Sequence, residues 1–220
     1  MARQPNWSDD YWLLLLQLYL RRPAGIKPMY SRAMVDLSLE LHIQPTALFA
    51  RMCALANLDT PRIERIWQTY GNNPRRLSRA VRLLRGMDGF NNAGEFYSGV
   101  GMNETFELDF KPVADGCPFT PVMLILVLDL YFRLIPVTMV AETPEVVELS
   151  RLIGVRPADV VAVMDRLRLC DPYLNRGVAP KTGDGTDPLL DACSDVWHRF
   201  GNSRPDELAS FAGELKEYFK

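Results

Sequence analysis

Apolar residues recur along most of the chain at the three- and four-residue spacing typical of amphipathic α-helices. Prolines, glycines and capping residues divide the first part of this pattern into five segments, at about 8–22, 30–41, 45–56, 60–71 and 73–86. Later in the chain the helix starts are Thr120-Pro121, Thr143-Pro144, Pro157, Pro188 and Pro205. Proline is tolerated in the first turn of a helix because an N–H there has no intrahelical partner. The pattern predicts an all-α fold.

Two parts of the sequence resemble each other at a nearly constant offset. The segment Leu16-Gln17-Leu18-Tyr19 recurs 112 residues later as Leu128-Asp129-Leu130-Tyr131, and Val35-Asp36-Leu37-Ser38 recurs at the same offset as Val147-Glu148-Leu149-Ser150. Residues 67–72 match residues 197–202 at an offset of 130. The larger offset implies about 18 extra residues in the Gly- and Pro-rich stretch 173–190. We therefore predict two tandem five-helix repeats that arose by duplication.

The repeats define the expected domains. The first repeat covers residues 1–89, a connector covers 90–118, and the second repeat covers 119–220 with a loop insertion at 173–190. Within the connector, Thr105–Phe110 alternates polar and apolar residues with a period of two. Residues 95–100 could pair with it across residues 101–103. We expect a short β-hairpin or an extended segment between the repeats.

The second and third helices expected in each repeat resemble a helix-turn-helix motif. In residues 145–160, Ser150 is the small residue where the helices touch, and Gly154 opens the turn. The first repeat has Ser38 and His42 at these places. A DNA-reading helix presents long polar side chains to the bases, but residues 45–54 offer only Arg51. A structural use of the motif is favoured, and DNA binding is the alternative.

Composition places the chain among ordinary globular proteins, with 48% hydrophobic and 24% charged residues. Its four cysteines form no C-x-x-C pair, so we expect free thiols in a reducing cytoplasm. The apolar run 121–140 contains Asp129 and Arg133, which favours a buried helix over a membrane span. With no signal peptide in the sequence, the expected location is cytoplasmic, with no membrane partner.

The formal net charge of −2 conceals two unequal halves. Residues 1–89 hold 13 basic and 7 acidic residues, whereas residues 90–220 hold 12 and 20. At 100° per residue, Arg75, Arg79 and Arg82 share one helix face, opposite an apolar face. We call these three residues the Arg ridge. The candidate contacts with a partner or phosphate are Arg62, Arg65, Arg75, Arg76, Arg79, Arg82 and Arg85.

Three interpretations of these arginines stay open: a solvated helix face, a contact with an acidic protein surface or a second subunit, and a contact with a phosphate backbone. Signals for an enzyme are weak. The two histidines, His42 and His198, lack the spacing of metal ligands, and the acidic residues Glu104, Glu107 and Asp109 are expected on a solvated hairpin, with the last two on one strand face. No cofactor or metal is predicted.

We expect a non-catalytic helical protein that binds a macromolecular partner, by protein interaction or self-association. A nucleic-acid-binding regulator is the second interpretation, and an enzyme with an unrecognised site is the third. The sequence specifies no small-molecule ligand.

Overall fold

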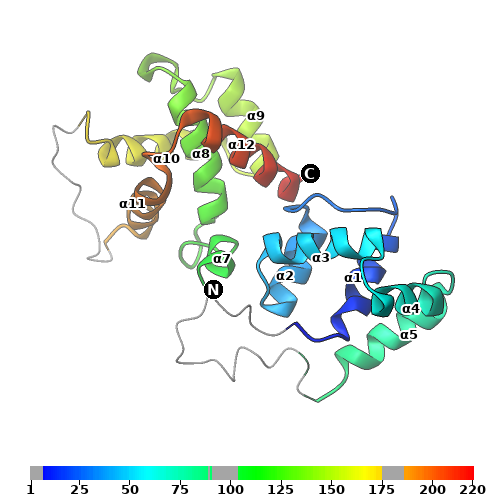
Figure 1. Cartoon of the computed structure of the whole chain (residues 1–220). Coiled ribbons are helices and arrows are strands. Elements are labelled where there is room, and N and C mark those ends of the chain that lie inside the picture. Colours follow the sequence, from blue (N-terminus) through cyan, green and yellow to red (C-terminus); the bar gives the residue numbers. More distant parts are fainter. Residues whose placement is uncertain (1–6, 89, 91–103, 175–185) are drawn as a thin grey trace. The chain divides into compact units, whose positions relative to one another are not determined.

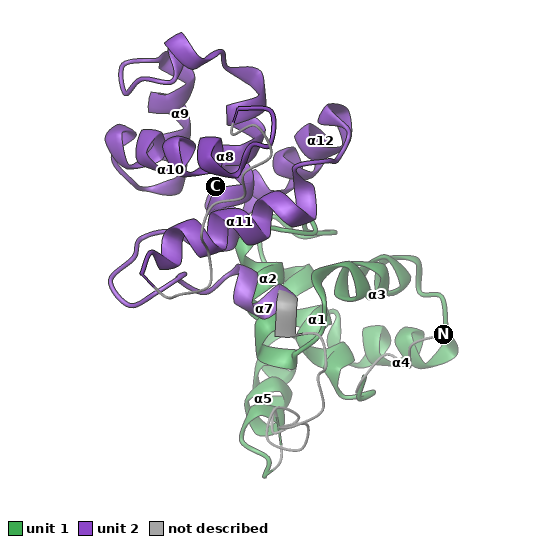
Figure 2. Ribbon diagram, turned by 90° about the vertical axis from the view of Figure 1, so that its left-hand side faces the viewer, with its two compact units in different colours: residues 1–103 green, residues 104–220 purple. Residues whose placement is uncertain are grey.

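The computed structural model describes residues 7–88, 90, 104–174 and 186–220. Within these residues every regular element is a helix and none is a strand (Figure 1), so the predicted all-α fold is confirmed. The chain divides into two compact units, residues 1–103 and residues 104–220, coloured separately in Figure 2.

Unit 1 contains five helices at the places that the sequence predicts. They are α1 (Tyr11–Leu20), α2 (Arg32–Leu41), α3 (Pro45–Asn57), α4 (Pro61–Tyr70) and α5 (Pro74–Arg85). The last three each begin with a proline. Thr60 and Asn73 cap α4 and α5, because their side-chain oxygens accept hydrogen bonds from backbone N–H groups at distances of 3.3 and 3.0 Å.

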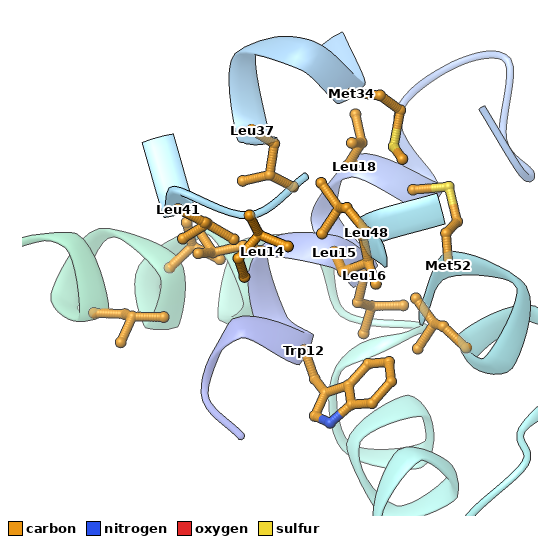
Figure 3. Close-up of a cluster of buried hydrophobic side chains, with 14 of the residues drawn as sticks. Trp12, Leu14, Leu15, Leu16, Leu18, Met34, Leu37, Leu41, Leu48 and Met52 are labelled. Atoms are coloured by element: carbon orange, nitrogen blue, oxygen red, sulfur yellow. The ribbon is translucent and has the colours of Figure 1, made fainter. Parts of the chain in front are cut away.

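The core of unit 1 is built around α1. This helix packs against α3, α4 and α5, and Leu14, Leu15, Leu16 and Leu18 are all buried on it. Figure 3 shows these leucines surrounded by side chains from α2 and α3, Met34 and Met52 among them. A helix that is apolar on nearly every side belongs inside a core, which accounts for the almost uninterrupted leucine run.

Unit 2 has its own core around α8 (Pro121–Arg133), which packs most extensively against four other helices. These are α9 (Pro144–Ile153), α10 (Pro157–Cys170), α11 (Pro188–Phe200) and α12 (Pro205–Leu215). The unit also contains α7 (Glu104–Asp109) and two short 3-10 helices, η1 (Pro136–Thr138) and η2 (Lys216–Phe219). All five helix starts predicted for this part of the chain are confirmed.

Residues 121–133 of the apolar run form the largely buried helix α8, as predicted, but the rest of the run to residue 140 lies beyond that helix, and Ile135, Val137 and Val140 are exposed. The charged residues of α8 are accommodated: Asp129 is 5% exposed, and its carboxylate accepts a hydrogen bond of 2.8 Å from Arg133 one turn later. Among the described residues, no helix has both the length and the apolar character needed to cross a membrane.

The predicted strand at Thr105–Phe110 is wrong, because residues 104–109 form α7. An alternation over six residues does not distinguish a strand from a short helix. Phe106 and Phe110 are four residues apart and both are partly buried, whereas Leu108 is 53% exposed. Phe110 packs against Tyr218, with ring centroids 5.0 Å apart. The partner strand expected at 95–100 lies outside the described residues.

The turns after α2 and α9 share one geometry. His42 and Gly154 both adopt the left-handed conformation, with φ of 53° and 74°. In each turn the next residue donates its N–H to a serine carbonyl at 3.0 Å, Ile43 to Ser38 and Val155 to Ser150. A left-handed residue after the last helical turn is the usual way to end a helix sharply.

Replacing Ser38 by alanine should stabilise unit 1. Its hydroxyl is fully buried and has no hydrogen-bond partner among the described residues, whereas the Ser150 hydroxyl donates to the Val147 carbonyl at 2.8 Å. A buried polar group without a partner costs about 1–3 kcal/mol. We therefore expect Ser38→Ala to raise the free energy of unfolding by about 1 kcal/mol and Ser150→Ala to leave it unchanged or lower it. Urea unfolding curves measure both. A loss of stability in Ser38→Ala would contradict the conclusion that the Ser38 hydroxyl is buried without a hydrogen-bond partner in the described part of the chain.

Candidate functional site

The Arg ridge lies on the outer side of α5, and the burial of its opposite face determines that orientation. Leu77 and Val81 are each 2% exposed, and Leu84 is 8% exposed, where α5 packs against α1 and α4. The three arginines of the ridge are all exposed. Within the described part of the chain, none of the three has a hydrogen-bonding or ion-pair partner.

The other four candidate arginines make contacts within unit 1. Arg85 forms a bidentate ion pair with Glu40, with distances of 2.5 and 2.7 Å, and this hydrogen bonding raises the pKa of its guanidinium. Arg62 pairs with Asp9 at 2.9 Å, Arg65 donates to the Pro61 carbonyl at 3.2 Å, and the guanidinium of Arg76 lies 5.2 Å from the ring centre of Tyr70. The ion pair of Arg85 could not be predicted from the sequence, since Glu40 is 45 residues away.

The ridge is suited to hold anionic oxygens. Arg75 and Arg82 are seven residues apart, which is about 10.5 Å along the helix axis, with Arg79 between them. A guanidinium can bind carboxylate or phosphate with two parallel hydrogen bonds. Three of them with no partner on one face could therefore engage a row of anionic groups.

Two large apolar side chains are exposed beside the ridge, and sequence reasoning missed both. Leu83 is 65% exposed and Met87 is 60% exposed. Leu83 follows Arg79 by about one helical turn and lies 40° from it around α5. The helical projection that places the ridge would therefore also have predicted that Leu83 is exposed. The exposed face of α5 thus combines a row of cations with an apolar edge.

The helices in the place of a DNA-reading helix offer few free cations. In α3 the guanidinium of Arg51 lies 4.1 Å from the ring centre of Trp7. At the start of α10, Arg156 forms a bidentate ion pair with Asp159, at 2.7 and 2.8 Å, which lowers the pKa of that carboxyl. These contacts occupy groups that direct readout of bases would need.

The described residues bring together no set of three or more His, Cys, Asp or Glu side chains that could hold a metal ion. Asp109, which the sequence placed on a strand face with Glu107, instead forms a bidentate ion pair with Arg199, with both distances 2.7 Å. On a helix, residues two apart point in different directions. His198 Nδ1 lies 2.7 Å from the Ser194 carbonyl oxygen, within its own helix.

The described residues line surface hollows in both units, of which two are relevant here. One, of about 330 Å³, lies beside the candidate residues Arg62 and Arg65 and is also lined by Asp9 and Tyr70. The other, of about 640 Å³, lies in unit 2 between α8, α9 and the C-terminal residues. Its lining contains both basic side chains and the carboxylates of Glu145 and Glu148.

The four cysteines form no disulfide, as expected for free thiols. Burial raises the pKa of the Cys170 thiol to about 11 and that of Cys193, which is fully buried, to about 12. The thiolate is the reactive form, so a raised pKa lowers reactivity near neutral pH.

Alkylation should therefore proceed in a defined order. With iodoacetamide at pH 8, we expect Cys53 and Cys117, which are partly exposed, to be labelled before Cys170. Cys193 should react only after unfolding in urea. Peptide mass spectrometry over time measures the order, and labelling of Cys193 as fast as Cys53 in the native protein would contradict it.

Comparisons with known proteins yield no match for this chain among protein-family models, curated proteins or solved structures.

Proposed function

We propose that this is a non-catalytic binding protein whose Arg ridge contacts an acidic macromolecular partner. The observation that carries the proposal is the presence of three exposed arginines on one face of α5 with no partner in the described part of the chain. Exposed charges of one sign steer the encounter with an oppositely charged surface and then form hydrogen bonds with it.

An acidic protein surface is the partner that the chemistry of α5 favours. Leu83 and Met87 lie exposed at the edge of the ridge, and apolar side chains at a contact gain free energy when they leave water. A protein partner can supply apolar groups next to its carboxylates. A phosphate backbone would contact the arginines but offers nothing to the exposed apolar side chains. Because the arginines are spaced one helical turn apart, nucleic acid is the second candidate.

We also propose that the two units are diverged repeats with helix-turn-helix-like second and third helices. Support comes from equivalent contacts at equivalent positions. Tyr19 packs against Trp67 with ring centroids 5.5 Å apart, and Tyr131 packs against Trp197 at 5.9 Å. The shared left-handed turns after α2 and α9 support the same relationship. On this account α5 and α12 are equivalent helices.

Binding to two defined polyanions tests the proposed function. The probes are a fluorescein-labelled poly-L-glutamate and a random-sequence DNA duplex, each titrated at about 50 mM salt with anisotropy as the readout. We expect R75E/R79E/R82E to weaken binding at least about 100-fold, because three charge-assisted hydrogen-bonding groups become repulsive. R75K/R79K/R82K, which keeps the charges, should lose much less.

A matched control reverses three exposed cations elsewhere. Arg22, Lys111 and Arg151 are exposed, and reversing them changes the net charge by the same amount. If both triple variants lose affinity equally, or if the unmodified chain binds neither probe at a concentration where it is a monomer, the proposal is wrong. Tighter binding of the duplex than of poly-L-glutamate would select the nucleic-acid alternative.

A further inference from the structure

We infer that the exposed face of α5 docks against the exposed face of α12 of a second copy of this chain, reciprocally, in a two-fold dimer. The inference rests on the proposed function, since it names the acidic partner of the Arg ridge. Its basis is the match between the two faces in charge, spacing and side-chain size.

The two faces carry charges of opposite sign at the same spacing. Glu207 and Glu214 are exposed on α12 and, in the described part of the chain, have no ion-pair or hydrogen-bond partner. They are seven residues apart, as are Arg75 and Arg82, so each pair spans about 10.5 Å along its helix. Two helices lying side by side can therefore bring both carboxylates to both guanidinium groups at once.

The side chains also match in size. Beside Glu207 and Glu214 on the helix surface, α12 exposes Ser210, with Gly213 one turn further along. Small residues allow a second helix to approach closely, and large side chains pack into the space above them. Leu83 is exposed on α5 and Met87 is exposed two residues beyond the end of that helix, and both could fill this space.

Lengths and symmetry favour a reciprocal arrangement. α5 has 12 residues and α12 has 11, so each can cover the other over three turns. A stable interface buries about 1,200–2,000 Å² in total, more than one such helix pair covers. In a two-fold dimer the α5–α12 contact occurs twice, because each copy contributes both faces.

A charge exchange between two variants tests the dimer. We expect the unmodified chain, with a mass of 25.0 kDa, to show a light-scattering mass of about 50 kDa at low salt and to dissociate as salt is raised. R75E/R82E makes both faces acidic and E207R/E214R makes both basic, so each variant alone should be a monomer. An equimolar mixture should recover the dimer, since each α5 then meets an α12 of opposite charge.

Apolar packing has a separate test. L83A/M87A keeps every charge and should weaken dimerisation about 10- to 100-fold, whereas the control R22E/K111E should leave it unchanged. Circular dichroism confirms that each variant is folded.

The outcomes separate this inference from the proposed function. A mass of 25.0 kDa for the unmodified chain at about 200 µM and low salt overturns the dimer, as does a mixture of the two charge variants that remains monomeric. If the dimer is absent but poly-L-glutamate still binds through the ridge, the proposed function stands and its partner is another acidic protein. If both are absent, both proposals fall.

Discussion

Replacing Gly201 by alanine is expected to destabilise unit 2 by about 2–4 kcal/mol. Gly201 follows α11 with φ of −64°, so its backbone is accessible to any residue. The reason lies instead in its contact with Trp197. An added Cβ would lie 2.6 Å from the Trp197 carbonyl oxygen and 2.8 Å from its Nε1, too close for either atom to stay in place. Trp197 is itself a buried core residue, so its displacement disturbs the packing on α8.

The same substitution at Gly71 tests the equivalent contact in unit 1. There a Cβ would lie 2.7 Å from the Trp67 carbonyl oxygen but 3.3 Å from its Nε1. Because the added Cβ crowds the indole less, we expect a smaller decrease in the free energy of unfolding, of about 1–3 kcal/mol.

Gly213 is the matched control for both. It lies within α12, and a Cβ added there meets no atom within 4 Å. Alanine is preferred over glycine inside a helix by about 0.5–1 kcal/mol, so Gly213→Ala should stabilise the protein. Urea unfolding curves measure all three variants. Equal effects at Gly201 and Gly213 would contradict the contact with Trp197.

Replacing one buried leucine of the central helix of either unit by alanine is expected to lower the free energy of unfolding by about 3–4 kcal/mol. Leu16 on α1 and Leu128 on α8 are both 0% exposed, and they occupy matching positions in the predicted repeats. Replacing either by alanine removes buried apolar contacts and leaves a cavity. In the described part of the chain, the core cluster around Leu16 consists of residues from unit 1. We therefore expect each substitution to weaken its own unit most.

Hydrogen exchange followed by mass spectrometry measures this effect helix by helix. Leu128→Ala should increase exchange chiefly in α8–α12, and Leu16→Ala chiefly in α1–α5. An equal loss of protection over both units after either substitution would be inconsistent with two separate cores.

Much of the fold could be predicted because local rules determine where these helices begin. Proline at the first helical position marks Pro45, Pro61 and Pro74 in unit 1, and Thr60 and Asn73 supply the caps before two of them. The amphipathic pattern of α5 likewise predicted which face is buried. These signals involve residues within one or two turns of each other, so a single sequence contains them.

Contacts between distant residues could not be predicted in this way. Arg85 forms an ion pair with Glu40, 45 residues earlier, and Asp109 forms one with Arg199, 90 residues later. The interpretation of Thr105–Phe110 as a strand failed for a related reason. Six alternating residues are compatible with either structure, and the contact of Phe110 with Tyr218 is made only in the folded chain.

The outer helices of the two units differ in surface charge. The outer face of α5 carries the Arg ridge, whereas that of α12 carries Glu207 and Glu214. The buried positions of both helices remain apolar, with Leu77 and Leu208 as examples. A near-neutral chain thus exposes a basic face on α5 and an acidic face on α12, the two surfaces that the proposals above assign to binding.

The most direct measurement of the central claim is a map of where an acidic probe binds. Amide chemical shifts of the ¹⁵N-labelled chain, recorded as poly-L-glutamate is added at low salt, report which residues sense the probe. The account predicts the largest shifts within α5, at Arg75, Arg79, Arg82 and Leu83, and their loss in R75E/R79E/R82E. Shifts centred on another part of the chain, with α5 unaffected, would contradict it.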